Sequence, residues 1–353
     1  MTSTNKIKFA VVGCGHIGTR HTEMILRNPE AALDAIIEIE KEKQEQLRIN
    51  YPGIGVFNSI EQYLQSGNLA DVLCIATPNG LHAQHAIQGI ESGMHVVIEK
   101  PMALEKRETQ QIIALAEKNN KKVFCVMQNR YSPPSSWLKD VVETGILGKI
   151  FIVQVNCYWN RDKRYYKSGN WHGNKKLDGG TLYTQFSHFI DLMYWLFGDI
   201  TNIQSRFKDF NHQDLTQFED SGIISFEFLS GGIGSLNFST SVWETNLESS
   251  ITVIAENGSV KIGGQYMDRV EYCMIKDYTM PELQPTNPAN DYGPYKGSAA
   301  NHQYIIANVI DTLLGRTTIT TNAYEGEMVV DIIERMYGAG NEILKIDKSK
   351  GPE

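Results

Sequence analysis

The stretch IKFAVVGCGHIG, residues 7–18, decides the fold of this chain. Its first half is an apolar run typical of a buried β-strand, and a helix-like stretch, residues 17–27, follows its last glycine. The pattern G-x-G-x-x-G therefore lies between a strand and a helix. Gly13 allows the tight turn, Gly15 lets a pyrophosphate approach the backbone, and Gly18 lets helix and strand pack closely. The stretch predicts a dinucleotide-binding βαβ unit.

The predicted cofactor contacts extend on both sides of this loop. His16 and Ile17 begin the helix, where free backbone N–H groups meet phosphate charge. Glu38 ends the next apolar run, about 20 residues beyond the last glycine, where an acid bonds the ribose 2′-hydroxyl. A carboxylate there repels a 2′-phosphate, so we expect NAD rather than NADP, although Lys41 and Lys43 lie nearby. The alternative is a solvated acid at the end of a strand.

Strand-like and helix-like segments alternate up to about residue 128. Such alternation is typical of βαβ units with a parallel sheet and right-handed crossovers. The expected strands are residues 7–12, 33–39, 72–76, 96–98 and 123–127, and the expected helices are residues 17–27, 81–92 and 106–119.

Beyond residue 128 strands follow one another without intervening helices. This pattern favours an α+β domain with a large, mostly antiparallel open sheet. We predict two domains, an NAD-binding Rossmann domain at residues 1–128 and a substrate-binding and oligomerisation domain at residues 129–353. The expected strands of the second are residues 151–159, 200–207, 221–228, 233–240, 248–255 and 258–262; the expected helices are 137–144, 186–197, 301–314 and 323–338, and 280–296 is a long loop.

The composition excludes several classes of protein. The 353 residues are 41% apolar and carry a formal net charge of −8, which argues against a general nucleic-acid binder. No apolar run approaches the roughly 20 residues of a membrane span, and the first residues do not resemble a signal peptide. The five cysteines form no C-x-x-C pair. We expect a cytoplasmic protein with reduced cysteines.

Thr77-Pro78-Asn79 follows the third expected strand. Ligands of open α/β sheets bind outside the carboxyl ends of the strands, so these residues are candidates for lining the nicotinamide ribose. An ordinary turn at the start of a helix explains them about as well. In the helix that follows, His82 and His85 form an H-x-x-H pair, but no further ligands complete a metal site, and we predict no metal.

Glu99-Lys100-Pro101 ends the next strand at the same edge. A lysine at such a place is usually exposed and structural. A partly buried ammonium, however, would hold a substrate hydroxyl and favour its alkoxide-like state as hydride leaves. We therefore take Lys100 as a candidate catalytic residue, with Glu99, Lys100 and His82 among the cofactor contacts.

The glycine loop, Thr77-Pro78-Asn79, Glu99-Lys100-Pro101, and Gly179-Gly180 running into His188-x-x-Asp191 together resemble the glucose–fructose oxidoreductase/inositol dehydrogenase/MocA (Gfo/Idh/MocA) family. The resemblance covers residues 6–337. It implies a Rossmann domain followed by a domain built on a mostly antiparallel sheet. It also implies that Lys100 is the lysine of the catalytic site, that Pro101 is a cis proline and that His188 is the catalytic histidine.

The chemistry of a secondary alcohol suits these two residues. Oxidation needs an acceptor for the hydroxyl proton, and a histidine near neutral pKa is better suited than a lysine. We expect His188 to act as the base and Lys100 as an electrostatic clamp, although the roles could be exchanged. Asp191 shares a helix face with His188 and is a candidate to orient it. Taken without the resemblance, His188 would be read as a core histidine.

Thr184 departs from the family pattern, which in many members has an aspartate four residues before the histidine. A threonine cannot serve as a carboxylate partner. Other motifs resemble the UDP-N-acetylglucosaminuronate 3-dehydrogenases, which carry Asn-Gln where this chain has Thr184-Gln185. These motifs are residues 128–131, residues 159–162 with Tyr165-Tyr166, and residues 171–173.

This second resemblance implies a sugar-nucleotide substrate oxidised at C3 and a substrate site in the second domain. An arginine suits a uronate carboxylate because its planar fork makes two parallel bonds. Arg161 and Arg164 are the nearest candidates, and a solvated basic loop is the alternative reading. The predicted substrate contacts are Asn129, Arg130, Arg161, Tyr165, Tyr166, Trp171, Thr184, Gln185 and His188.

Three rival functions stay open from the sequence. Two belong to the same family, an inositol or aldose dehydrogenase and a glycosidase that uses bound NAD for transient oxidation. The third is a non-catalytic regulator that senses the cofactor, which would not need both Lys100 and His188. The family resemblance also implies a homodimer or homotetramer formed through the face of the large sheet.

Overall fold

The computed structural model describes residues 6–67, 69–167, 171–293, 295–340 and 344–345. The chain divides into two compact units. Unit 1 comprises residues 1–127 and 302–330, and unit 2 comprises residues 128–301 and 331–353. Residues 302–330, which the sequence analysis assigned to the second domain, thus belong with the N-terminal segment by their contacts.

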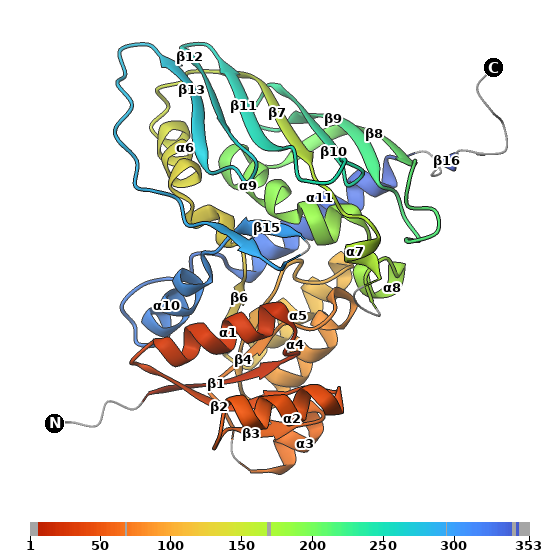
Figure 1. Cartoon of the computed structure of the whole chain (residues 1–353). Helices are drawn as coiled ribbons and strands as arrows, with labels where there is room; N and C mark the ends of the chain where they lie inside the picture. The colour runs from red at the N-terminus through yellow and green to blue at the C-terminus, as the bar shows by residue number, and fades with distance from the viewer. Residues whose placement is uncertain (1–5, 68, 168–170, 294, 341–343, 346–353) are drawn as a thin grey trace. The chain divides into compact units, whose positions relative to one another are not determined.

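Unit 1 is built on a six-stranded parallel sheet with the order β3-β2-β1-β4-β5-β6 (Figure 1). This confirms the predicted Rossmann fold, because the order reverses at β1. The strands are β1 (Ile7–Val12), β2 (Ala31–Ile37), β3 (Gly55–Phe57), β4 (Val72–Ile75), β5 (His95–Ile98) and β6 (Val123–Cys125).

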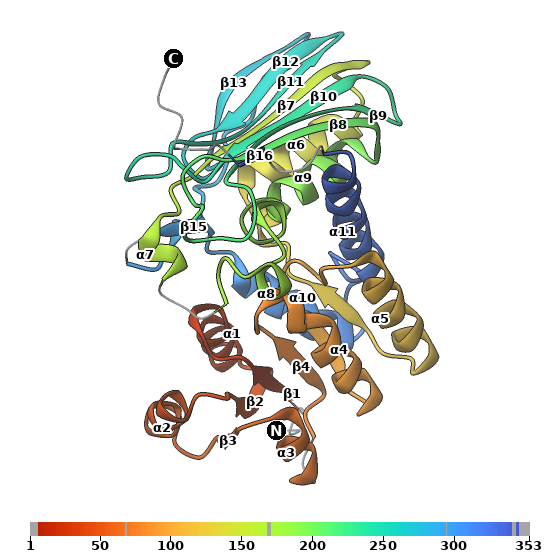
Figure 2. The same ribbon diagram turned by 90° about the vertical axis from the view of Figure 1, so that its right-hand side faces the viewer.

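Helices cover both faces of this sheet, with α1 on one face and α4 and α5 on the other (Figure 2). They are α1 (His16–Arg27), α4 (His82–Glu91) and α5 (Lys106–Lys118). In addition, α10 (His302–Leu313) packs against α1. Sequence patterns missed β3 and the helices α2 (Lys41–Asn50) and α3 (Ile60–Gln65). The helix α2 buries only Gln44 and Leu47, so its apolar face is too narrow to give a periodic signal.

The register of the strands brings four predicted site segments to one edge. Val12 pairs with Ile37 on one side and with Ile75 on the other, and Ile75 pairs with Ile98. Each of these residues ends its strand. Consequently the residues that follow, Gly13, Glu38, Ala76 and Glu99, leave the sheet at the same level, at its carboxyl edge.

Unit 2 is built on an eight-stranded sheet with the order β13-β12-β11-β7-β10-β9-β8-β16. The neighbours are antiparallel except for β7 with β10 and β8 with β16, which confirms a mostly antiparallel sheet. The strands are β7 (Ile150–Tyr158), β8 (Ile200–Asp209), β9 (Ser221–Phe228), β10 (Ile233–Ser239), β11 (Glu248–Ala255), β12 (Gly258–Gly263), β13 (Arg269–Ile275) and β16 (Leu344–Lys345).

The helices α6 (Pro133–Glu143) and α9 (Ser187–Phe197) lie against one face of this sheet (Figures 1 and 2). Sequence analysis missed β13, and it was wrong in treating residues 280–296 as one loop. Residues 289–291 and 296–299 pair as the short hairpin strands β14 and β15. A strand of three or four residues is too short for a period-2 pattern to stand out. The helix α11 (Ala323–Gly338) agrees with the prediction. None of the described helices has the length and apolar character needed to cross a membrane.

Candidate active site

The glycine loop of unit 1 leaves room for a ligand only at its centre. Gly13 has a φ of +81°, which a residue with a side chain rarely adopts, and a Cβ on Gly18 would lie 1.9 Å from the Gly13 carbonyl oxygen. A Cβ on Gly15, by contrast, would meet no heavy atom within 4 Å. Gly15 is also the N-cap of α1, and no side chain caps this end of the helix in the described part of the chain. This open, positively polarised backbone fits the pyrophosphate of a dinucleotide.

Glu38 is held beside this loop by backbone N–H groups. Its Oε2 accepts a hydrogen bond from the Cys14 N–H at 2.9 Å and its Oε1 accepts one from the Glu40 N–H at 3.0 Å. The Gln44 amide donates to the Glu38 carbonyl oxygen at 2.7 Å. Each carboxylate oxygen has a further lone pair. The side chain is thus fixed in a position where it can accept a hydrogen bond from a ribose hydroxyl.

His82 joins the two turns at the carboxyl edge. Its Nε2 lies 2.8 Å from the carbonyl oxygen of Thr77, and its Nδ1 lies 2.7 Å from that of Pro101. Burial holds the pKa of His82 below its ordinary value, and the contacts with the two carbonyl oxygens offset only part of this effect. Both ring nitrogens therefore contact the backbone, so we assign His82 to the support of the turns that carry Thr77, Pro78 and Asn79 and, on the other side, Lys100.

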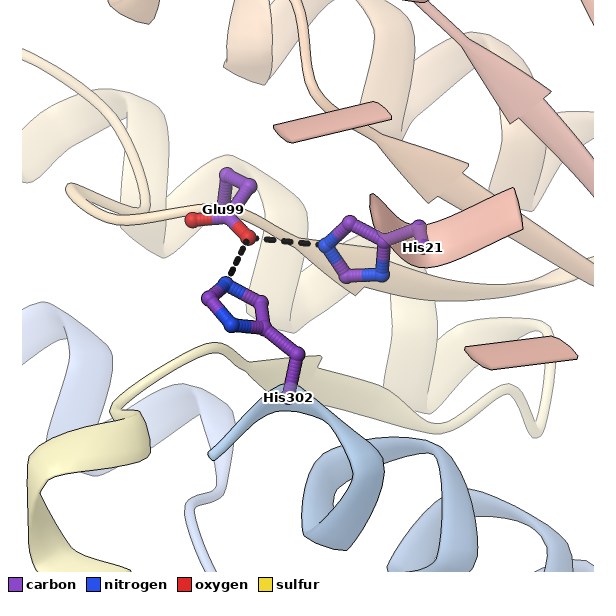
Figure 3. A group of neighbouring side chains, drawn as sticks. All are labelled: His21, Glu99 and His302. Atoms are coloured by element: carbon purple, nitrogen blue, oxygen red, sulfur yellow. Dashed lines mark hydrogen bonds and ion pairs between the residues drawn. The ribbon is translucent and has the colours of Figure 1, made fainter. Parts of the chain in front are cut away.

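The turn that carries Lys100 contains the cis Lys100–Pro101 peptide bond that the family resemblance implied. The Lys100 backbone N–H donates to Glu99 Oε2 at 3.3 Å. The other oxygen, Oε1, lies 2.7 Å from His21 Nε2 and 3.5 Å from His302 Nε2 (Figure 3). Burial would raise the pKa of Glu99, but its contacts with the two imidazoles hold that pKa well below its ordinary value. The sequence analysis missed His302, which comes from a distant helix.

These three buried side chains place potential metal ligands within 4.8 Å of one another. The contact between His21 and Glu99 fits a hydrogen bond better than two ligands of one metal ion. Ligands around a tetrahedral zinc lie about 3.3 Å apart, whereas the His21–Glu99 contact has the length of a hydrogen bond. A histidine ligand also donates its other ring N–H to an acceptor. Yet the Nδ1 atoms of His21 and His302 have no hydrogen-bond partner among the described residues, and Nε2 of His302 has only its ion-pair contact with Glu99.

His188, in unit 2, is positioned by an irregular helix. Residues Leu182–Phe186 form a π-helix, η3, which continues into α9 at Ser187. Single π turns inside helices are frequent at functional sites. The ring of His188 is buried, and its Nε2 lies 3.2 Å from the side-chain nitrogen of Gln128. Gln128 was not given a role from the sequence. Its position directly after a strand of the parallel sheet could have marked it as a candidate site residue.

Asp191 forms a buried ion pair with Arg130. Its carboxylate accepts hydrogen bonds from Arg130 Nε at 2.9 Å and from Arg130 Nη2 at 2.6 Å, and both side chains are 1% exposed. This pair joins α9 to the 3-10 helix η2 (Gln128–Tyr131). The pair thus helps to fix the segment that carries His188, while the substrate contact predicted for Arg130 stays a prediction.

Arg161 is unusual because its charged side chain is buried inside unit 2. Its guanidinium is buried, with 2% of the residue exposed, and it donates to Gln185 Oε1 at 2.8 Å, to the Asn160 carbonyl at 2.7 Å and to the Lys296 carbonyl at 3.0 Å. The rings of Trp159 and Tyr295 lie 4.7 Å and 5.2 Å from its central carbon. Burial lowers the pKa of Arg161. Among the described residues no carboxylate lies within ion-pair distance of this cation.

Arg164 has the opposite surroundings. It is partly exposed and lies 2.7 Å from Asp162 and 3.5 Å from Glu244. Since surface ion pairs of this kind contribute little to stability or recognition, the solvated-loop reading fits Arg164. The structure thus separates two arginines that sequence alone treated as equivalent.

The predicted aromatic contacts lie side by side. Tyr165 receives a hydrogen bond from the Gln185 amide at 2.8 Å and has its ring centre 4.3 Å from that of His172. The ring centre of Trp171 lies 4.0 Å from that of the same histidine. Tyr165 and Tyr166 both belong to a small apolar cluster with Phe218, and their ring centres lie 5.0 Å apart. Burial raises the pKa of Tyr165 and of Tyr166.

Asn129 and Thr184 complete the predicted substrate set. The Asn129 amide lies 3.5 Å from Ser298 Oγ, while its Oδ1 is buried without a hydrogen-bond partner among the described residues. The Thr184 hydroxyl contacts both the carbonyl and the carboxylate oxygen of Asp178. A buried carboxylate thus lies next to Thr184 after all, supplied by a residue that the sequence analysis did not consider.

Comparison with known proteins gives consistent matches along the chain. Residues 7–127 match the family model GFO_IDH_MocA, described as "Oxidoreductase family, NAD-binding Rossmann fold", and residues 136–261 match the GFO/IDH/MocA C-terminal domain. A WlbA dehydrogenase from Bordetella pertussis, solved with NADH and UDP-GlcNAcA, is 30% identical with a TM-score of 0.83, over 95% of this chain and 96% of its own. A WlbA from Chromobacterium violaceum, solved with the same two molecules, is 29% identical with a TM-score of 0.84, over 96% and 94%. The oxidoreductase sll0816 of Synechocystis is 25% identical over 74% of this chain and 73% of its own.

Proposed function

Because this chain belongs to the Gfo/Idh/MocA family of NAD-binding oxidoreductases, we propose that it removes hydride from a secondary hydroxyl of a sugar that carries an anionic group. The substrate that we favour is a UDP-sugar acid oxidised at C3. Two relatives at 29% and 30% identity were solved with NADH and UDP-GlcNAcA, which supports this substrate class.

NAD supplies the hydride acceptor at nicotinamide C4. In this chain the backbone around Gly15 would hold the pyrophosphate, Glu38 would accept the ribose hydroxyl, and Thr77, Pro78 and Asn79 would lie along the nicotinamide ribose. The Glu38 carboxylate also disfavours a 2′-phosphate, in keeping with NAD as the cofactor.

In this proposal Lys100 and His188 carry out the chemistry. His188 takes the proton of the substrate hydroxyl, since an imidazole has a suitable pKa for this task. Lys100 stabilises the negative charge that develops on the same oxygen, and its backbone is anchored to Glu99. The side-chain amide of Gln128 contacts Nε2 of His188; with its oxygen turned toward that nitrogen it would hold the proton on Nε2 and leave Nδ1 to take the substrate proton.

The observation that carries the proposal is the buried charge of Arg161. Leaving a cation buried without an anion costs several kcal/mol, and this guanidinium is surrounded by neutral donors, acceptors and rings. Through Gln185 it is bonded to η3, the π-helix that runs into His188. A substrate carboxylate or phosphate would neutralise the charge close to the residue proposed as base.

The test is an assay of NADH formation with paired substrates. UDP-N-acetylglucosaminuronate should be oxidised at least about 100-fold more efficiently than UDP-N-acetylglucosamine, which lacks the carboxylate, because a site built for a polar group rejects an analogue without it. Arg161→Gln should remove this preference, and the matched variant Arg164→Gln should keep it. Equal rates for both substrates with the unmodified enzyme, or preferential oxidation of aldoses or inositols, would contradict the proposed substrate.

We also propose that the chain works in the cytoplasm as a homodimer or homotetramer formed through the open face of the unit 2 sheet. Six exposed apolar side chains support the interface. The strand registers put all of them on the same face of the sheet. They are Ile152, Ile223, Ile233, Ile254, Tyr272 and Met274.

A further inference from the structure

The contact between Thr184 and Asp178 has a direction that hydrogen-bond chemistry defines. The Thr184 hydroxyl has one proton, and both of its contacts with Asp178, to the carbonyl oxygen at 2.9 Å and to the carboxylate Oδ1, are contacts with acceptors. The proton therefore points toward Asp178. The lone pairs of the Thr184 oxygen point away from Asp178, so that toward any other group this hydroxyl is an acceptor.

The carboxylate is itself held in place. Asp178 is 1% exposed, and its second oxygen, Oδ2, accepts a hydrogen bond from the Gly173 N–H at 2.8 Å. Asp178 ends the short helix α8 (Lys175–Asp178), and Gly179 and Gly180, both at positive φ, lead from it to the segment that contains Thr184. The backbone thus brings the carboxylate back against a residue six positions further on.

Thr184 lies in the segment that carries the other proposed substrate contacts. Its neighbour Gln185 bonds both Arg161 and Tyr165, and His188 follows one turn later. An acceptor at Thr184 suits a sugar, whose hydroxyls are donors as well as acceptors.

We propose that Thr184 contacts the substrate by accepting a hydrogen bond from a sugar hydroxyl, and that Asp178 is a positioning residue that orients the Thr184 hydroxyl as an acceptor. This inference rests on the proposed function. It adds a specificity contact and gives the buried Asp178 carboxylate a task in the reaction. No proton moves between Asp178, Thr184 and the substrate; the contact only fixes the direction in which the substrate hydroxyl points.

The experiment compares four variants by single-turnover reduction of bound NAD and by steady-state kinetics. Thr184→Val, which keeps the shape but lacks the hydroxyl, should lower kcat about 100-fold, and Thr184→Ser, which keeps the hydroxyl, should stay within about threefold of the unmodified enzyme. Asp178→Asn should lower kcat in the same way as Thr184→Val. The double variant Asp178→Asn/Thr184→Asp moves the carboxylate to the other end of the hydrogen bond and should recover at least a tenth of the lost rate.

NADH binding, followed by fluorescence, and thermal unfolding report whether each variant is folded. In folded variants an unchanged kcat for Thr184→Val, or a rate for the double variant no higher than for Asp178→Asn, would overturn the inference while leaving the proposed function in place. An unmodified enzyme that reduces bound NAD with none of the UDP-sugar acids, aldoses or inositols would overturn both.

Discussion

At the scale of single residues, Lys100 and His188 should separate chemistry from cofactor binding. Lys100→Ala and His188→Ala should each lower kcat by at least about 100-fold, because they remove the charge clamp and the base. Affinity for NADH should change far less than kcat, since the glycine loop and Glu38, which would hold the pyrophosphate and the ribose, are left intact. His95→Gln, on a histidine away from the predicted site, is the matched control. Normal turnover in either alanine variant would show that the catalytic assignment is wrong.

Glu219 is a second residue whose surroundings predict a measurable effect. Burial raises its pKa to about 7, and Tyr337 donates a hydrogen bond to its Oε1 at 2.6 Å. Since an unfolded glutamate has a pKa near 4.5, the folded chain binds more protons between pH 4.5 and 7. Stability from this group is therefore present at low pH and is lost as the pH rises through that range.

Glu219→Gln removes this titration and keeps an acceptor for Tyr337. Raising the pH from 5 to 8 should therefore lower the unfolding free energy of the unmodified protein more than that of the variant. The difference between the two proteins should be on the order of 3 kcal/mol. Urea unfolding at both pH values measures the difference, and histidines that titrate in the same range cancel in the comparison. An identical pH dependence for both proteins would contradict the raised pKa.

At the scale of elements, the junction of β1 and α1 makes two neighbouring glycines behave differently. Gly18→Ala should lower both the melting temperature and NADH affinity, because its Cβ would overlap the Gly13 carbonyl oxygen. Gly15→Ala should leave the melting temperature within a few degrees of the original, because its Cβ meets nothing. It should nevertheless weaken NADH binding, since it fills the space that the pyrophosphate needs. NADH binding to Gly15→Ala with unchanged affinity would contradict the cofactor position.

The His21–Glu99–His302 cluster connects three elements of unit 1, namely α1, the turn after β5, and α10 (Figure 3). Glu99→Ala should lower the unfolding free energy by about 3–5 kcal/mol, because it removes the buried carboxylate that is hydrogen-bonded to His21 and lies against the ring of His302. Glu42→Ala, at an exposed position of α2, should change it by less than about 0.5 kcal/mol. If the cluster holds hydrogen bonds and no metal, EDTA should leave the melting temperature unchanged; a clear drop would favour a bound cation.

At the scale of the whole molecule, the open face of the unit 2 sheet should control assembly. Ile233→Lys and Met274→Lys place charges among the exposed apolar side chains of this face and should convert the oligomer to monomers. Leu229→Lys, in the turn after β9 and off the face, is the control. Light scattering coupled to size-exclusion chromatography gives the mass directly. A monomeric unmodified protein would contradict the proposed interface.

The sequence by itself determined the features that depend on local order along the chain. The glycine loop, the strands that precede it and follow it, and the even spacing of apolar residues in β9 and β10 all arise from neighbours within a few positions, so their patterns are readable. Lys100 and His188 could be proposed as catalytic residues because each lies in a short motif. The helix α2 and the strand β13 could not be predicted because they bury few side chains, so their sequences lack a clear apolar pattern.

Only the tertiary structure decided which of the candidate side chains share an environment. It paired Arg130 with Asp191 and brought His302 to Glu99. It buried Arg161 with no carboxylate partner among the described residues, while leaving Arg164 at the surface. It also put Asp178 against Thr184, the residue whose departure from the family pattern had no explanation in the sequence. Burial and long-range partners set the charge and the hydrogen-bonding role of each group, and neither property is encoded in the spacing of residues.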